Sequence, residues 1–362
     1  MEFIKPGINI NFVGFRRWAY GFSLGLIVLS MIALAARGGP NYGVDFAGGI
    51  LVQVKFNKAT TAQEIRDGLK DIDIGNATIQ QFGEDDSNEY LIRVQKADAD
   101  LNALSNQVQK DLETKFGQGA LEVRRVEMVG AKVGQDLRQK ALYAIFYAIL
   151  FILIYISGRF ELKWGMSIGV AGGLMLAVYL ASLVGAGVTW LILTALLVTL
   201  AVCFAFQLKY ALGAIVALIH DVTITVGIFA LLDKEITLTI VAALLTIVGY
   251  SLNDTIIVFD RIRENFRKSR KKPQAQVINE SINETLSRTV LTSGTTLLVV
   301  VCLFFLGGPV ISDFAFAMIV GIGVGTYSSI YVASPILLLW PENGASSPLF
   351  KKKIAVKPAK AK

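Results

Sequence analysis

Long runs of apolar residues make up most of this chain, and one hydrophilic stretch interrupts them near the N-terminus. A helix of about 20 apolar residues is long enough to cross the roughly 30 Å hydrocarbon core of a bilayer. The pattern therefore predicts eight transmembrane helices. Their predicted ranges are 18–36, 137–157, 164–184, 188–208, 210–232, 236–259, 289–312 and 314–340.

The first apolar run, 18–36, has two interpretations. Ala33-Leu34-Ala35 resembles the small-residue site at which a signal peptide is cleaved. The run is longer than the apolar core of a usual signal peptide, so we favour an uncleaved helix. Arg16 and Arg17 then hold residues 1–17 in the cytoplasm, because basic residues stay on the cytoplasmic side.

Residues 164–208 contain no charged residue over a length that is too great for one span. We expect two helices that turn at Gly185-Ala186-Gly187. A sequence of uncharged residues this long has room for both helices and the turn between them.

Residues 37–136 are predicted to form the one sizeable hydrophilic domain. Alternating apolar and polar positions predict strands at 48–56, 77–82, 90–95 and 121–129. The capping box Thr61-x-x-Glu64 opens a short helix, and an apolar face over 101–116 predicts a second one. The acidic residues Glu84-Asp85-Asp86 mark a turn. This βαββαβ order is typical of a ferredoxin-like α+β domain.

Composition places the chain in the membrane class, since 54% of residues are hydrophobic and 17% are charged. The net charge of +7 is unevenly distributed. Residues 38–132 carry an excess of acidic residues, whereas basic residues gather at the ends of the apolar runs. This is the positive-inside pattern and not a nucleic-acid-binding face. It predicts cytoplasmic termini, a periplasmic 37–136 domain, a cytoplasmic loop 260–288 and a cytoplasmic tail 341–362.

Few residues have the chemistry of an enzyme. Cys203 and Cys302 lie inside apolar runs, where cysteine usually acts as a small hydrophobic residue. The single histidine excludes a multi-histidine metal site. No nucleotide-binding motif or nucleophile–base arrangement is present, so we expect no enzymatic activity, metal or cofactor. We interpret the glycines of two apolar runs as helix-packing residues: Gly169, Gly172, Gly173, Gly321, Gly323 and Gly325.

Asp254 is the strongest candidate functional residue. No charged residue occurs in the 18 positions before it, and the next five residues are apolar or carry a hydroxyl. A charge inside hydrocarbon costs roughly 3 kcal/mol, so such a residue is a proton- or ion-site hypothesis. The alternative is an acid that reaches the interface or is permanently paired for folding. At helical spacing, Tyr250 shares its face and Asn253 borders that face.

Arg288 is the predicted counter-ion of Asp254, because it opens the next helix across a cytoplasmic loop. An Asp–Arg pair that breaks and reforms is a switch suited to a proton-driven protein. Arg288 alone could also be an ordinary positive-inside residue. His220 and Asp221 lie at the middle of their span. They form either a buried packing pair or a second station of a proton path.

Two further motifs flank these spans. Asp260, Arg261 and Glu264 are expected to form salt bridges that fix the cytoplasmic loop. On the other side, a hinge motif joins the first helix to the outer domain, where glycines permit positive φ or close approach and Asp45 can cap the turn. The hinge residues are Gly43, Asp45, Phe46, Gly48 and Gly49.

Together these motifs closely resemble the SecF proteins of the SecD/SecF protein-export family, within the resistance-nodulation-division superfamily. The matching residues are Gly43-Val44-Asp45-Phe46-x-Gly48-Gly49, His220-Asp221, Ser251-Leu252-Asn253-Asp254-Thr255, Phe259 to Asn265 and Ser287-Arg288-Thr289. The resemblance implies a bacterial inner-membrane subunit that works with SecD and the SecYEG channel. It also implies that the proton-motive force moves the outer domain to assist a translocating polypeptide, with Asp254 and Arg288 in proton passage.

The family usually has six spans, so the pair at 164–208 is additional. Two alternatives to a proton-coupled export subunit remain. One is an efflux transporter of small molecules or lipids, and the other is a structural partner without proton coupling.

Overall fold

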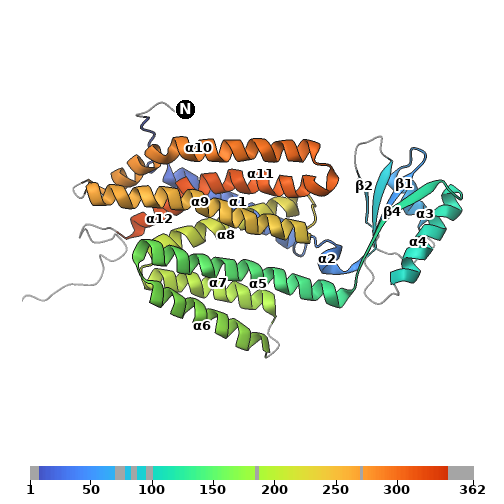
Figure 1. Cartoon of the computed structure of the whole chain (residues 1–362), viewed down its shortest axis with the longest axis horizontal. Helices are drawn as coiled ribbons and strands as arrows, with labels where there is room; N and C mark the ends of the chain where they lie inside the picture. The colour runs from blue at the N-terminus through green and yellow to red at the C-terminus, as the bar shows by residue number, and fades with distance from the viewer. Residues whose placement is uncertain are drawn as a thin grey trace, which may run out of the picture.

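The computed structural model describes residues 8–69, 78–82, 88–94, 101–183, 187–269 and 272–340. A long helical bundle carries a small α+β domain at one end (Figure 1). Three predicted features fall wholly or mostly outside the described residues: the acidic turn 84–86, the turn 185–187 and the tail 341–362.

The small domain contains the short helix α2 (Val44–Ala47) and then elements in the predicted βαββαβ order. These are β1 (Gly49–Phe56), α3 (Ala62–Gly68), β2 (Thr78–Phe82), β3 (Glu89–Val94), α4 (Leu101–Phe116) and β4 (Leu121–Val129). The sheet has the order β2-β3-β1-β4, and all three neighbouring pairs are antiparallel. Helices α3 and α4 lie on the face away from the bundle (Figure 1).

The domain core lies between these helices and the sheet. Alternate residues of β1, beginning with Ile50, are buried because successive side chains point to opposite faces. Val108 and Leu112 of α4 close this core from the other side. The predicted capping box is confirmed: the Thr61 hydroxyl accepts from the Glu64 amide, and the Glu64 carboxylate accepts from the Thr61 amide.

The bundle consists of eight long helices, as far as the described residues extend. They are α1 (Arg16–Ala36), α5 (Ala131–Ile156), α6 (Trp164–Leu183), α7 (Val188–Ala205), α8 (Lys209–Leu231), α9 (Leu238–Lys268), α10 (Gln274–Leu306) and α11 (Pro309–Ser328). A π-helical turn (Ser157–Glu161) follows α5. A second π turn (Ser329–Ala333) leads from α11 to α12 (Ser334–Ile336) and a 3₁₀ turn (Leu337–Leu339).

Seven of these helices are long and apolar enough to cross a membrane, whereas the sequence predicts eight spans. The difference is α7, whose apolar segment Thr189–Ala205 is shorter than the other seven. The prediction extended this helix to residue 208. The helix ends earlier because Gln207 adopts a φ of 54°, which a continuing helix does not allow.

The predicted cytoplasmic loop 260–288 is largely helical, since α9 continues to Lys268 and α10 begins at Gln274, and its side of the membrane stays a prediction. Polar side chains extend both helices beyond the apolar zone. Arg261 pairs with Glu264 one turn later and with Glu284 on α10, which confirms the predicted salt bridges of this motif. Asp260 accepts from Arg159 at 2.6 Å.

Helix α5 also begins earlier than predicted, at Ala131, so the predicted domain boundary at 136 falls inside a helix. The early part of this helix packs on the hinge, since a Cβ at Gly134 would lie 2.9 Å from the Phe46 carbonyl oxygen. Helix α11 begins at Pro309 instead of residue 314, because Gly308 at φ 74° makes the turn and proline suits a first helical position.

The glycine prediction holds for one helix. In α11, a Cβ at Gly321 would meet the Ile247 side chain and one at Gly325 would lie 2.9 Å from the Ser251 Cβ. Gly323 has no such neighbour within 4 Å. The predicted packing role of Gly169, Gly172 and Gly173 is wrong within the described chain, because these glycines of α6 are exposed and have nothing within 4 Å.

Candidate functional site

Asp221 is completely buried in the middle of α8 and accepts hydrogen bonds at both carboxylate oxygens. His220 Nδ1 lies 2.9 Å from Oδ1. The hydroxyls of Ser251 on α9 and Ser328 on α11 donate to Oδ2 at 2.5 and 2.9 Å. Three helices therefore meet at one carboxylate.

His220 extends this cluster to α1. Its Nε2 lies 3.0 Å from the hydroxyl of Ser23, which is 3.1 Å from the Tyr327 hydroxyl. Tyr327 in turn donates to the backbone carbonyl of Ala19 at 2.8 Å. Asp221 is thus joined to α1 by a continuous chain of hydrogen-bonding side chains.

Asp254 is also completely buried, but it has fewer partners. The hydroxyl of Ser293 on α10 donates to Oδ2 at 3.2 Å, and that hydroxyl lies 2.7 Å from Thr326 Oγ1 on α11. Oδ1 of Asp254 has no hydrogen-bond partner among the described residues. An uncompensated buried carboxylate oxygen is costly, so the charged form of Asp254 is less well compensated than that of Asp221.

The predicted ion pair between Asp254 and Arg288 is not formed in the structure. Arg288 is exposed on α10, although its charge is near enough to act on Asp254. Asn253, which the sequence predicts to border the face of Asp254, is exposed while Asp254 is buried. Adjacent helical residues differ by about 100° in direction, so Asn253 lies at the edge of the buried face.

Helix α11 connects the two acids through the consecutive residues Thr326, Tyr327 and Ser328. Thr326 contacts the partner of Asp254, and Ser328 contacts Asp221 directly. These three residues and Ser23 were not predicted from the sequence as functional residues. Isolated hydroxyls in apolar helices carry little signal, because many of them bond to their own helix, as Thr292 and Thr295 do.

The hinge motif behaves as predicted at its glycines, since Gly48 and Gly49 have φ values of 75° and 128°. Asp45, however, does not cap its own turn. Its carboxylate accepts from the Leu238 amide at 2.9 Å, at the first residue of α9. Asp45 therefore caps the helix that carries Asp254, because the first amides of a helix lack partners within it. Phe46 is buried at the base of the bundle.

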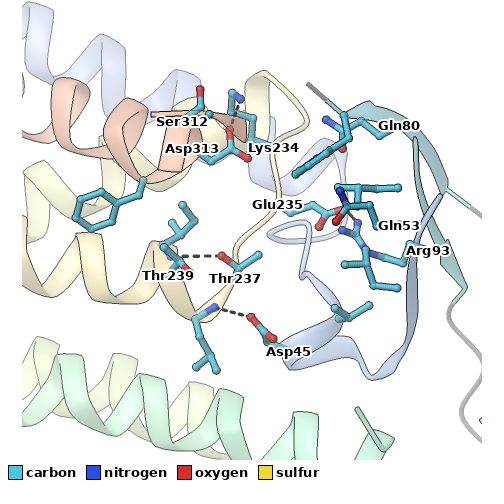
Figure 2. A pocket seen from close by; sticks show the side chains of 18 of the residues that line it. Asp45, Gln53, Gln80, Arg93, Lys234, Glu235, Thr237, Thr239, Ser312 and Asp313 are labelled. Atoms are coloured by element: carbon cyan, nitrogen blue, oxygen red, sulfur yellow. Dashed lines mark hydrogen bonds and ion pairs between the residues drawn. The ribbon is translucent and has the colours of Figure 1, made fainter. Parts of the chain in front are cut away.

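A cleft of about 970 Å³ separates the sheet from the end of the bundle. Figure 2 shows Arg93 of the sheet pointing at Glu235 of the loop between α8 and α9. The two side chains form an ion pair and are 11% and 13% exposed. Burial lowers the pKa of Arg93 to about 10, and the charge of Asp45 opposes this shift. Arg93 is thus protonated at neutral pH.

These features define a multi-spanning membrane protein with a small α+β domain at one end of the bundle and two buried acids. Comparison with known families gives the class: the model of the protein-export membrane protein SecD/SecF C-terminal region matches residues 108–182 and 177–343. The SecD/SecF GG motif matches residues 32–60, which include the hinge. The chain belongs to the SecD/SecF family.

Its relatives over nearly the full length are SecF subunits. The protein translocase subunit SecF of Magnetococcus marinus is 41% identical over 342 residues, which are 94% of each chain. SecF of Escherichia coli O157:H7 is 36% identical over 91% of this chain and 87% of the relative. The chain is thus a SecF-type membrane protein of the protein-transport class.

Solved structures of SecDF have the same fold. The crystal structure of SecDF, a translocon-associated membrane protein from Thermus thermophilus, superposes with a TM-score of 0.66 at 35% identity. It covers 92% of this chain, while this chain spans 39% of that longer SecDF chain. A super-membrane-facing form of SecDF gives a TM-score of 0.55 at 33% identity.

Proposed function

We propose that this protein is an accessory subunit of the bacterial Sec translocase that couples the proton-motive force to late steps of polypeptide export. It works with SecD and the SecYEG channel in the inner membrane, with both termini cytoplasmic and residues 37–136 periplasmic. It is not an enzyme and needs no cofactor, and protons are its coupling ion. We assign the outer domain to the ferredoxin-like class, which the strand order β2-β3-β1-β4 supports.

The observation that carries this proposal is the buried carboxylate of Asp254 with its unpartnered oxygen. Protonation of Asp254 removes the charge that is costly in a buried site. It also weakens the electrostatic attraction between Arg288 on α10 and Asp254 on α9. A membrane potential of 100 mV does roughly 2.3 kcal/mol of work per charge, which is sufficient to bias a conformational equilibrium.

The contact of Asp45 with α9 supports a direct mechanical connection between this site and the outer domain. Asp254 lies on the same helix whose first amide is bound by the hinge residue Asp45. A tilt or shift of α9 therefore acts on the hinge between α1 and β1. Asp221 and His220 form the second station, which links α8, α9 and α11 to α1.

The experiment compares Asp254→Asn with Asn253→Ala, its exposed neighbour on α9. Membrane vesicles containing each variant are tested for stimulation of polypeptide export. We expect Asp254→Asn to abolish stimulation while the protein still inserts into the membrane, and Asn253→Ala to retain it. Full stimulation by Asp254→Asn would sink the proposal.

A further inference from the structure

Two buried side-chain oxygens of the bundle have no hydrogen-bond partner among the described residues: Oδ1 of Asp254 and Oγ1 of Thr289. Their side chains belong to residues that are 0% and 1% exposed. Each such atom is costly when it is left unpaired in a buried site. Two of them on the packed helices α9 and α10 therefore point to a shared ligand.

The positions of these residues suit one small ligand. Thr289 lies one helical turn before Ser293 on the buried face of α10, and Ser293 donates to the other oxygen of Asp254 at 3.2 Å. Side chains one turn apart are separated by about 5–6 Å, so the Asp254 carboxylate, which is bonded at Ser293, lies about one helical turn from Thr289. Groups at about this separation are close enough for one water molecule to hydrogen-bond to both.

The Thr289 hydroxyl also differs from its neighbours on the same helix. The hydroxyls of Thr285, Thr292 and Thr295 all donate to a carbonyl one turn earlier. Thr289 makes no such bond. Its hydroxyl is therefore available to hold a ligand beside the carboxylate.

We propose that Asp254 and Thr289 jointly bind one water molecule, through which the proton reaches Oδ1 of Asp254. This inference rests on the proposed uptake of a proton by Asp254. When the bound water carries the proton as hydronium, one of its O–H bonds breaks as the O–H bond on Oδ1 forms. The electron pair returns to the water oxygen, and a neutral water remains on Thr289, which is a positioning residue.

The other charged and titratable groups near Asp254 are exposed or bond to other residues. Arg288 is exposed beside Thr289, and the His220–Asp221 pair on α8 bonds to α1, α9 and α11. On α11, Tyr327 contacts Ser23 and Ala19. Tyr250 on α9 donates to Thr296. None of these described groups occupies Oδ1 of Asp254.

The test removes the hydroxyl while retaining the shape of the side chain. Thr289→Val should lower proton-driven stimulation of export about five- to tenfold, as expected for loss of one hydrogen bond. Thr289→Ser should restore it, since serine keeps the hydroxyl. The matched control is Thr292→Val, whose hydroxyl bonds only to the backbone of Arg288. Equal activity of Thr289→Val and wild type, or failure of Thr289→Ser to restore activity, overturns the inference.

A second measurement uses the wild-type chain and does not depend on a variant that folds. Infrared difference spectra between high and low pH should contain an O–H band of bound water that shifts in H₂¹⁸O. The band should be absent from Asp254→Asn; its absence from wild type contradicts the bound water. Asp254→Asn alone tests proton coupling. If Asp254→Asn is inactive and Thr289→Val is fully active, the proposed bound water is wrong while proton coupling through Asp254 stands.

Discussion

At the scale of single residues, the two buried acids differ in how fully they are bonded. Asp221 receives His220 and two serine hydroxyls, so both of its oxygens are occupied. Asp254 receives one hydroxyl and keeps one oxygen open to a proton. The sequence predicted that both acids lie inside the membrane. It could not show which acid is more fully bonded, because their hydroxyl partners come from other helices.

The network at Asp221 predicts a cost for losing Ser328. Ser328→Ala removes one donor to a buried carboxylate and should lower stability by about 0.5–1.5 kcal/mol. Ser329→Ala is the control, because that hydroxyl donates only to the Thr326 carbonyl nearby. Thermal unfolding in detergent measures both. Equal melting temperatures for the two variants would show that the bond to Asp221 adds no stability.

The capping box of α3 predicts a pH effect in the outer domain. Hydrogen bonds from Thr61 to the Glu64 carboxylate hold the pKa of Glu64 below its usual value. A lowered pKa in the folded state stabilises the fold above the unfolded pKa, and this contribution is lost as the pH falls through the folded pKa.

Hydrogen exchange of α3, corrected for intrinsic rates, checks this expectation. Wild type should be better protected than Glu64→Gln at pH 7, and the difference should disappear as the pH falls through the folded pKa of Glu64, which lies below its usual value. A difference that is constant over this pH range contradicts the role of the Glu64 charge.

At the scale of elements, hydrophobic patterning predicted the positions of the helices well and their ends poorly. Helix α9 runs past its apolar segment because Arg261, Glu264 and Lys268 pair along its polar end. Helix α7 ends early at Ala205, two residues before Gln207 with its positive φ. Neither end depends on hydrophobicity, so the apolar pattern alone could not locate it. Similarly, Asp45 caps α9 through a contact between residues that are far apart in sequence.

The crossing of α9 and α11 predicts different outcomes for two glycines. In Gly325→Ala the new methyl group would lie 2.9 Å from the Cβ of Ser251, and Ser251 donates to Asp221. We expect a loss of about 1–3 kcal/mol, together with reduced export, because the helices must separate. Gly323→Ala has open space and should be tolerated. Melting temperatures of both variants in detergent test this; a tolerated Gly325→Ala would mean that the helices are not held this close.

At the scale of the whole molecule, the α+β domain contacts the bundle at the hinge and across the cleft. The hinge pairs its backbone with the α8–α9 loop, where the Gly43 amide donates to the Ile236 carbonyl at 2.9 Å. Across the cleft, Arg93 binds Glu235 (Figure 2). The sequence predicted the hinge from its glycines. It could not predict this ion pair, which exists only once the sheet faces the bundle.

Loss of the Arg93–Glu235 pair should free the domain. Glu235→Gln leaves the buried Arg93 without its partner charge, so the domain should sample a wider range of positions. Spin labels at Lys58 and Leu306, with Cys302 replaced, report the distance from domain to bundle. The control Lys234→Gln breaks a pair with Asp313 that lies within the bundle. Distance distributions that are equally narrow in all three proteins would contradict a holding role.

The most direct test of proton coupling through Asp254 is polypeptide export with and without an uncoupler. Export is measured in vesicles that contain wild type, Asp254→Asn or Asn253→Ala, at equal amounts of inserted protein. Wild type and Asn253→Ala should stimulate export only while the proton-motive force is present. Asp254→Asn should show the same low export in both conditions. Stimulation by Asp254→Asn that the uncoupler removes, as in wild type, would contradict the role of Asp254.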